Sequence, residues 1–407
     1  MKFAHLSDVH IGGWREPKLR ELNLLTFKRA IEICINEHVA FVLIAGDLFN
    51  TSLPPIDLIK DVTSELEKLR KSDIEVYIIP GSHDFSPSNK TMIDVLENAG
   101  LCINVMKVNE INDKLHLEFT VDKTNTKIAG IYGRRSSLEK EQYKKLDKTN
   151  LENEKGFKIF MFHSLISELK PDFLEMIEAE PLSSLPKGFD YYAGGHPHFI
   201  MTKKIEGYGL MVYPGATFPN NFSELEKFQH GGFFLVDVSN EIEVKYQDII
   251  IKEFEGFNID VDGLDPEEAQ RKIINSVNRK IKDKIVTLRI HGTLNSGRIS
   301  DIDFREIHHK LSDAFVVLKN INKLTTKEVE QFKNIENDIE SIEETIIKDY
   351  ASKTKFNDFG EVSLLIKSLM HQLSLEKGEG ETNSDFEEKI NDNCLRVLKL
   401  NNDNKED

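Results

Sequence analysis

Apolar and polar positions follow a repeating order along the first part of the chain. Residues 3–6, 41–45 and 74–79 are apolar runs of strand length, and each ends in a short polar cluster. Between them, residues 17–36 and 58–69 carry apolar side chains three or four positions apart, which predicts helices with one buried face. Apolar strands that alternate with helices are typical of an α/β fold in which both faces of the sheet are covered.

After residue 101 the apolar runs become shorter but continue to predict strands. These strands are expected over residues 115–120, 127–132, 157–162, 189–193, 210–214 and 233–238. Together with the first part they predict one large domain over residues 1–245. A small α+β unit is expected over residues 246–322, and its first helix begins at Asp265 and Pro266, which suit a helix cap and first turn.

The last part of the chain, residues 323–407, has the pattern of separate amphipathic helices. Apolar residues recur every three or four positions over residues 329–346, 362–373 and 386–400, with a polar linker over residues 377–384. These helices look too short and too separated to bury their apolar stripes on one another. We therefore expect the tail to dock on a partner, with helices packed back on the body as the alternative.

The composition allows a sizeable core and places much of the acidic excess in the tail. Of 407 residues 39% are hydrophobic, and the formal net charge is −16. Residues 326–407 hold 20 Asp and Glu against 11 Lys and Arg, so the rest of the chain is only weakly acidic. A polyanionic partner such as DNA is therefore not excluded.

Cysteine usage and hydropathy predict a cytoplasmic protein. Cys34, Cys102 and Cys394 are far apart, which favours buried hydrophobic residues in a reducing compartment over a disulfide framework or a zinc site. The first predicted strand begins directly after Lys2, so we expect no signal peptide, and no apolar run approaches transmembrane length.

Polar clusters stand directly after five of the predicted strands. They are Asp8 and His10, then Asp47, then Ser82, His83 and Asp84, then His163, and finally His196 and His198. Polar sites in such sheets gather at the carboxyl ends of strands, so these side chains are expected to converge. Carboxylate and imidazole ligands without thiolate favour Mn, Fe or Zn. A carboxylate between two such ions would help to activate a water for attack at phosphorus.

In this order the clusters resemble the calcineurin-like metallophosphoesterases. The stretches LSDVHIG, GDLF and GSHDF, and the YPGAT that follows GHPH, are similar to those of the SbcD-type DNA double-strand-break repair nucleases and their archaeal and eukaryotic counterparts. The motifs lie within residues 3–220. The resemblance implies an α/β sandwich of two sheets flanked by helices, a small capping domain that binds DNA, and a helical tail.

The resemblance also implies two divalent ions, typically Mn²⁺, and the residues that hold them. The first ion would take Asp8, His10 and His198, and the second would take His163, His196 and a bridging Asp47. His83 matches the family's catalytic histidine, which stabilises the transition state or protonates the leaving oxygen. Asp84 would orient His83 or its loop.

Two positions depart from the family pattern. Ser82 stands where the family has an asparagine whose carbonyl oxygen binds the second ion, so Ser82 is a weaker candidate ligand, or only a turn residue. Asn50 stands where archaeal and eukaryotic members often have a histidine. Arg134 and Arg135 are candidates for phosphate contacts, with an exposed basic turn as the alternative.

The resulting hypothesis is a Mn²⁺-dependent DNA nuclease in double-strand-break repair. The resemblance implies exonuclease action on duplex ends, endonuclease action on single strands or hairpins, a homodimer, and docking of the tail on an ABC-type coiled-coil ATPase. The alternatives are a phosphatase or cyclic-nucleotide phosphodiesterase of the same superfamily, or a scaffold in which Ser82 has weakened catalysis.

Overall fold

The structure is a computed structural model that describes most of the chain. It covers residues 1–398 except 87–89, 134–138, 172–173, 175–176, 278, 335–346, 348–361 and 376–382. Its packing divides the chain into two compact units. The first takes residues 1–259, 272–290 and 303–321, and the second takes residues 260–271, 291–302 and the described residues from 322 onward.

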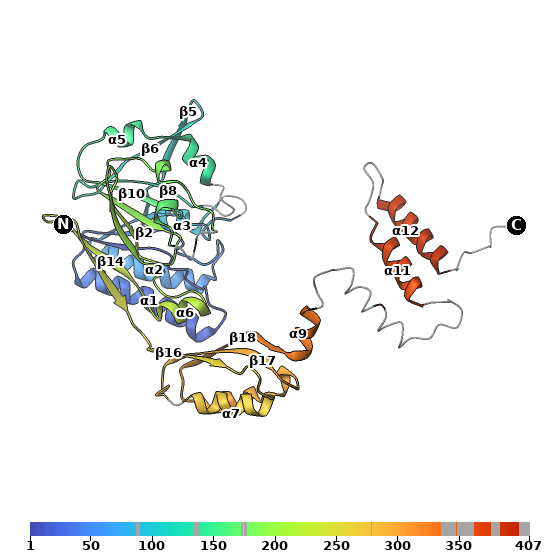
Figure 1. Ribbon diagram of the computed structural model, residues 1–407. Helices are drawn as coiled ribbons and strands as arrows, with labels where there is room; N and C mark the ends of the chain where they lie inside the picture. The colour runs from blue at the N-terminus through green and yellow to red at the C-terminus, as the bar shows by residue number, and fades with distance from the viewer. Residues whose placement is uncertain are drawn as a thin grey trace. The chain divides into compact units, whose positions relative to one another are not determined.

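Two six-stranded sheets form the centre of the first unit (Figure 1). The first sheet has the order β15 (Glu243–Ile249), β14 (Gly231–Asp237), β1 (Lys2–Leu6), β2 (Phe41–Ala45), β3 (Glu75–Ile79) and β4 (Ile103–Asn104). The second has the order β12 (Met201–Ile205), β13 (Gly209–Tyr213), β11 (Tyr191–Gly195), β10 (Lys158–His163), β8 (Lys127–Ile131) and β7 (Thr120–Val121).

The two sheets pack face to face through one apolar core. Phe3 and Phe41 from the first sheet, and Ile159 and Tyr191 from the second, belong to a single buried cluster. The Phe3 ring stacks on that of Phe41 at 5.0 Å and meets the Tyr191 ring edge-on at 5.2 Å. Since both faces of these strands are covered, their sequences are apolar at nearly every position.

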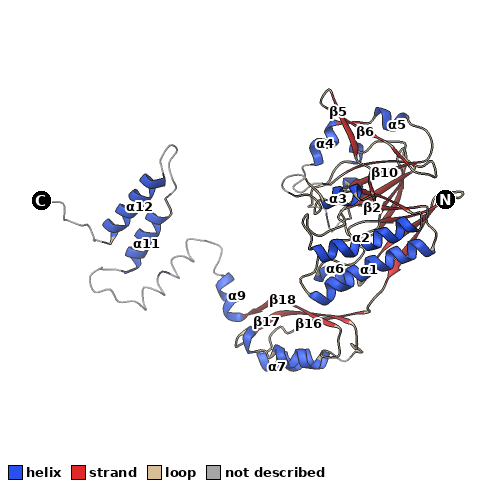
Figure 2. Cartoon of the chain, turned by 180° about the vertical axis from the view of Figure 1, so that it is seen from behind, coloured by secondary structure: helices blue, strands red, loops and turns tan. Residues whose placement is uncertain are grey.

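Helices cover the outer faces of the sandwich. The helices α1 (Pro17–Asn36) and α2 (Ile56–Lys71) pack with the first sheet through a second buried cluster (Figure 2). The helices α4 (Glu139–Lys145) and α5 (Thr149–Asn153) bury Tyr143 and Leu151 in a third cluster with the second sheet. The predicted α/β sandwich of two sheets flanked by helices is confirmed.

Strand direction brings the polar clusters to one edge. In the first sheet β1, β2 and β3 run parallel, and in the second β8, β10, β11 and β13 run parallel.

The predicted strands of the large domain all overlap observed ones. Among the elements that the sequence pattern did not predict are α3 (Met92–Asn98), α6 (Phe222–Phe228) and β5 (Lys107–Ile111). The strand β5 forms a hairpin with the predicted strand β6 (Lys114–Glu118), which pairs also with β9 (Leu146–Asp147). Every residue of β5 is exposed, so its apolar signal is weak.

The predicted small α+β unit corresponds to a three-stranded sheet. Its strand order is β16 (Phe254–Asp260), β17 (Ile285–Leu294) and β18 (Val316–Thr326). The helix α7 (Pro266–Ser276) connects the first two strands, and α8 (Phe304–Lys310) connects the last two. The order strand, helix, strand, helix, strand agrees with the sequence pattern, and Asp265 accepts a hydrogen bond from the Glu268 backbone N–H as a helix cap does.

The described part of the tail contains three helices, α9 (Lys327–Asn334), α11 (Val362–Leu373) and α12 (Asn383–Val397). Figures 1 and 2 both show α11 and α12 side by side. The two helices therefore contact each other, but none of their described residues is buried, which agrees with the expectation that they do not bury their apolar stripes on one another. Most of the expected helix over residues 335–346, the linker over residues 377–382 and the end of the last helix lie outside the described residues. None of the helices that the structure describes is long and apolar enough to span a membrane.

Candidate metal centre

The candidate residues lie in loops at the carboxyl ends of five strands. Asp8 and His10 follow β1, Asp47 follows β2, and Ser82, His83 and Asp84 follow β3 in the first sheet. In the second sheet His163 is the last residue of β10, and His196 and His198 follow β11. The fold brings these side chains together because the edges of the two sheets meet here.

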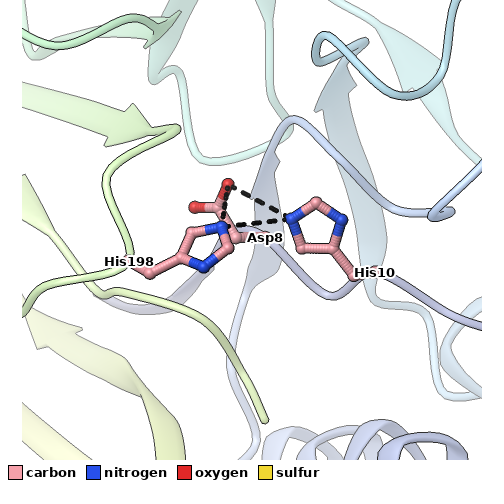
Figure 3. A group of neighbouring side chains, drawn as sticks. All are labelled: Asp8, His10 and His198. Carbon is pink, nitrogen blue, oxygen red and sulfur yellow. Dashed lines mark hydrogen bonds and ion pairs between the residues drawn. The ribbon is translucent and has the colours of Figure 1, made fainter. Parts of the chain in front are cut away.

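One group joins Asp8, His10 and His198 (Figure 3). The Nε2 atoms of the two histidines are 3.2 Å apart. The Asp8 Oδ1 atom lies 4.0 Å from Nε2 of His10 and 3.7 Å from Nε2 of His198. Three ligand atoms from β1 and β11 loops therefore face one point.

Asp47 lies between this group and His163. Its Oδ2 atom is 3.6 Å from Nε2 of His10 and 3.3 Å from Nε2 of His163. Asp8, Asp47 and His163 form a second group of ligand atoms, and His10, Asp47 and His83 form a third. The Asp47 carboxylate therefore belongs to both of these groups of ligand atoms.

His196 and Ser82 are close to the cluster but contribute less to it. The backbone N–H of His196 donates to both Asp8 oxygens at 3.1 Å, and its ring lies 5.3 Å from the His163 ring, edge-on. Among the described residues, no group of converging ligand atoms includes the His196 side chain. Ser82 is buried on the same turn as His83.

Hydrogen bonds on the far nitrogen orient three of the imidazoles. Nδ1 of His163 lies 2.8 Å from the Ala45 carbonyl, and Nδ1 of His83 lies 2.9 Å from the Asn50 carbonyl. A carbonyl only accepts, so each Nδ1 carries the hydrogen and Nε2 keeps a lone pair for a cation or proton. Nδ1 of His198 lies 2.9 Å from Oε1 of Glu224, a carboxylate in α6.

Asp84 holds two of the loops together rather than facing the cluster. Its carboxylate accepts from the backbone N–H groups of Leu48 at 3.3 Å, Phe49 at 3.1 Å and Gly81 at 2.9 Å. Burial, reinforced by the charge of Asp47, raises the pKa of Asp84 to about 7. Asp84 thereby fixes the turn that carries His83 against the turn that carries Asp47.

Four of the candidate ligands have a strained backbone. Asp8, His10 and Asp47 have φ angles of 49°, 48° and 53°, and His196 has a φ of 92°. Residues with side chains rarely adopt these values, which cost about 1–3 kcal/mol each. The strained turns aim side chains from strand ends back toward the point between the sheets.

Three glycines make room for the imidazole of His163. A Cβ at Gly46 would lie 2.1 Å from its Nδ1, one at Gly195 would lie 2.8 Å from the same atom, and one at Gly133 would lie 2.5 Å from its Cδ2. A fourth, at Gly81, would lie 2.2 Å from Oδ1 of Asp47. No larger residue fits at these positions without displacing a candidate ligand.

The charges in the cluster are strongly coupled. Burial lowers the pKa of His10 to about 3 and raises the pKa of Asp8. Burial would also lower the pKa of His163, but the Asp47 carboxylate outweighs it and raises that pKa to about 10. For His198, the hydrogen bond to Glu224 and the nearby Asp8 outweigh burial and raise the pKa to about 8.

This arrangement fits divalent cations. Asp8 and Asp47 are almost completely buried, and such carboxylates are costly unless a positive charge compensates them. Nε2 of His163 is buried and has no hydrogen-bond partner among the described residues, although it faces both carboxylates. Oxygen and nitrogen ligands in this mixture suit Mn, Fe or Zn.

Sequence reasoning missed Glu224 and the Asn50 carbonyl. Asn221 and Glu224 have the spacing of a helix cap, and the Asn221 side chain does accept from the Glu224 backbone N–H at 3.0 Å. That signal indicates a helix start, not a partner for His198. A backbone carbonyl has no sequence signal. The candidate phosphate contacts Arg134 and Arg135 lie outside the described residues.

Comparisons with known proteins agree with this site. The sequence profile of the calcineurin-like phosphoesterase family matches residues 1–199, which contain all the candidate ligands. The chain is 27% identical over 376 residues to a Methanococcus maripaludis protein named DNA double-strand break repair protein Mre11, covering 83% of this chain and 92% of that protein.

Two further relatives with the same name show a similar likeness. The Sulfolobus acidocaldarius protein is 30% identical over 307 residues, which cover 72% of this chain and 76% of that protein. The Thermoplasma acidophilum protein is 30% identical over 306 residues, which cover 72% and 77%. Such identity over most of both chains is a family relationship, and this chain belongs to the Mre11 family of calcineurin-like phosphoesterases.

Proposed function

We propose that this chain is a two-metal, Mn²⁺-dependent DNA nuclease that acts in double-strand-break repair. The observation that carries the proposal is the convergence of Asp8, His10, Asp47, His163 and His198 on one point at the edge of the sandwich. The names of the relatives support DNA as the substrate. The activities would be exonuclease action on duplex ends and endonuclease action on single strands or hairpins.

The first ion would be held by Asp8, His10 and His198, which form one group of ligand atoms. The second would be held by His163 and His196, with Asp47 shared between the ions. His163 and Asp47 face each other at 3.3 Å, whereas support for His196 is its position beside His163. Ser82 is the weakest candidate because a neutral hydroxyl stands where the family has an amide oxygen.

The ions would supply an activated water and neutralise charge that develops on the phosphate. His83 would exchange a proton with the reacting oxygens. In support of this role, its Nδ1 faces the Asn50 carbonyl, which leaves Nε2 for the proton. Its backbone N–H also donates to Oδ1 of Asp47 at 2.8 Å, which fixes the distance between the proton carrier and the bridging ligand.

The test is cleavage of end-labelled duplex DNA with Mn²⁺, comparing the native chain with His83→Ala. Native cutting that disappears in His83→Ala supports the nuclease. His116→Ala is a matched control, because His116 lies in β6, pairs with Asp147 and is remote in sequence from every candidate ligand. Turnover of small phosphoesters without cleavage of DNA would contradict the proposal in favour of another calcineurin-like phosphoesterase. Loss of both activities, reversed by Ser82→Asn, would favour the weakened scaffold.

For partners we propose a homodimer and an ABC-type coiled-coil ATPase that binds the tail. The hairpin of α11 and α12 keeps large apolar side chains exposed, with Leu364 at 60%, Met370 at 41% and Leu373 at 65%. Exposed apolar side chains on a helix fit a hydrophobic groove on a partner. Deleting residues 326–407 should abolish binding of the ATPase and leave Mn²⁺-dependent cleavage intact, and retained binding would contradict this assignment.

A further inference from the structure

A cavity of about 500 Å³ adjoins the candidate metal centre. Its wall includes His196 and His198, and the rest comes from the segment after β10, the loop after β11 and the helix α6. Its apolar lining consists of Leu165, Leu174, Ile177, Pro197, Phe199 and Phe228. The volume lies within the range of about 300–1,000 Å³ that is usual for small-molecule sites.

Three polar side chains of the cavity wall, those of His198, Asn221 and Glu224, are bonded to one another. The other polar residues of the wall are His196, Ser223 and Lys227, and Nζ of Lys227 lies 5.1 Å from the centroid of the Phe228 ring. Glu224 Oε1 accepts from Nδ1 of His198 at 2.9 Å and from the Asn221 side chain at 2.5 Å, and its Oε2 accepts from the Asn220 backbone N–H at 2.7 Å. Oδ1 of Asn221 accepts from the Glu224 backbone N–H. Because most of the wall is apolar and includes two aromatic side chains, the cavity suits a flat ring system.

The position of His198 connects the cavity with the metal centre. Its Nε2 faces Asp8 and His10, while the same residue forms part of the cavity wall. A phosphodiester bound at the cluster of ligand atoms would therefore have one of its attached nucleosides beside the cavity. Phe199 is held at the wall by the Tyr213 ring, edge-on at 5.7 Å, and Phe228 adds a second aromatic side chain.

We propose that this cavity binds one unstacked nucleobase of the nucleotide next to the bond that is cleaved. The inference rests on the proposed nuclease function and adds to it a base-binding subsite. A base inside a duplex is stacked and paired and must leave the stack before it enters such a pocket. Aromatic walls accept any base because every base has a π-face, so the subsite selects unpaired nucleotides rather than a sequence.

The first experiment maps cleavage of a single-stranded oligonucleotide that contains one abasic residue, with the full chain and Mn²⁺. The bond on one side of the abasic residue should be cut about tenfold more slowly than in the intact oligonucleotide, since stacking on the pocket is lost. Bonds elsewhere in the same oligonucleotide are the internal control. Equal cleavage beside intact and abasic residues would overturn the subsite.

Variants of the wall test whether this cavity is responsible. Phe228→Ala and Ile177→Ala should reduce the discrimination against the abasic residue toward unity. Ile250→Ala is the matched control for the second, because Ile250 is 59% exposed, like Ile177 at 52%, but lies outside the cavity. Variants that fold and keep the native discrimination would overturn the assignment to this cavity.

A binding measurement separates this inference from the nuclease proposal. In His83→Ala with Mn²⁺, calorimetry should show thymidine 5′-monophosphate binding about tenfold more tightly than deoxyribose 5-phosphate, and Phe228→Ala should remove the difference. This result without DNA cleavage by the native chain would contradict the nuclease and support the pocket. Cleavage with equal binding of the two ligands would keep the nuclease and overturn the pocket.

Discussion

Replacing Gly46 with alanine would test how closely the fold confines His163. Gly46 has a φ of +89°, and a Cβ built on it would lie 2.1 Å from Nδ1 of His163. That nitrogen is hydrogen-bonded to the Ala45 carbonyl at 2.8 Å, and the far side of the ring is enclosed by Gly133. The imidazole of His163 therefore cannot move away from the added Cβ without losing its hydrogen bond to the Ala45 carbonyl or its short distance to Asp47.

The loss of unfolding free energy expected for Gly46→Ala has two parts, and the variant Gly207→Ala separates them. A left-handed backbone costs alanine about 1–2 kcal/mol. Loss of a buried hydrogen bond adds about 1–3 kcal/mol. Gly207 has a φ of +79° and nothing within 4 Å of an added Cβ, so Gly207→Ala carries the first part alone. We expect Gly46→Ala to lower the free energy of unfolding by about 2–5 kcal/mol, against about 1–2 kcal/mol for Gly207→Ala.

The displaced imidazole should also weaken Mn²⁺ binding. Disturbing the orientation of a metal-ligating histidine typically costs about 10- to 100-fold in affinity. Mn²⁺ titration followed by electron paramagnetic resonance measures this affinity, and urea unfolding of the metal-free variants measures stability. If Gly46→Ala and Gly207→Ala were equal in both measurements, His163 would not be confined in this way, and its role as a ligand would be refuted.

Three further predictions concern Glu224, Ser82 and His5. Glu224→Gln should weaken Mn²⁺ binding about 10- to 100-fold by removing the charged partner of His198, as titration calorimetry would show, and unchanged affinity would rule out this orienting role. Ser82→Asn should tighten the weaker of two Mn²⁺ binding steps, and an unaltered second step would mean that residue 82 is only a turn residue. Burial lowers the pKa of His5 from 6.5 to about 3, so the unfolded state takes up a proton as the pH falls below 6.5 and stability falls with it. Urea titrations between pH 6 and pH 4 measure how steeply the unfolding free energy falls with pH. This slope should be smaller in His5→Leu than in the native chain by up to about 1.4 kcal/mol per pH unit, and identical slopes would contradict the burial of a neutral His5.

Local sequence pattern predicted the main strands of an α/β fold and the positions of the candidate ligands, whereas the two-sheet sandwich was expected from the family resemblance. The runs that became β1, β2 and β10 are apolar at nearly every position because both faces are covered, and such runs are visible without knowledge of their partners. Asp8, Asp47 and His163 were recognisable because each stands at the carboxyl end of such a run, where this fold class places its chemistry.

Contacts between segments far apart in the chain were decided only by the tertiary structure. The partner of His198 is Glu224, which reads in the sequence as part of a helix cap, and the partner of His83 is a backbone carbonyl that no residue type identifies. The cavity beside the metal centre likewise has walls from three separate segments. Periodicity reports which face of an element is buried, whereas the identity of its neighbours depends on how the elements pack. For the same reason the sequence did not indicate that α11 contacts α12, and only the structure shows this contact.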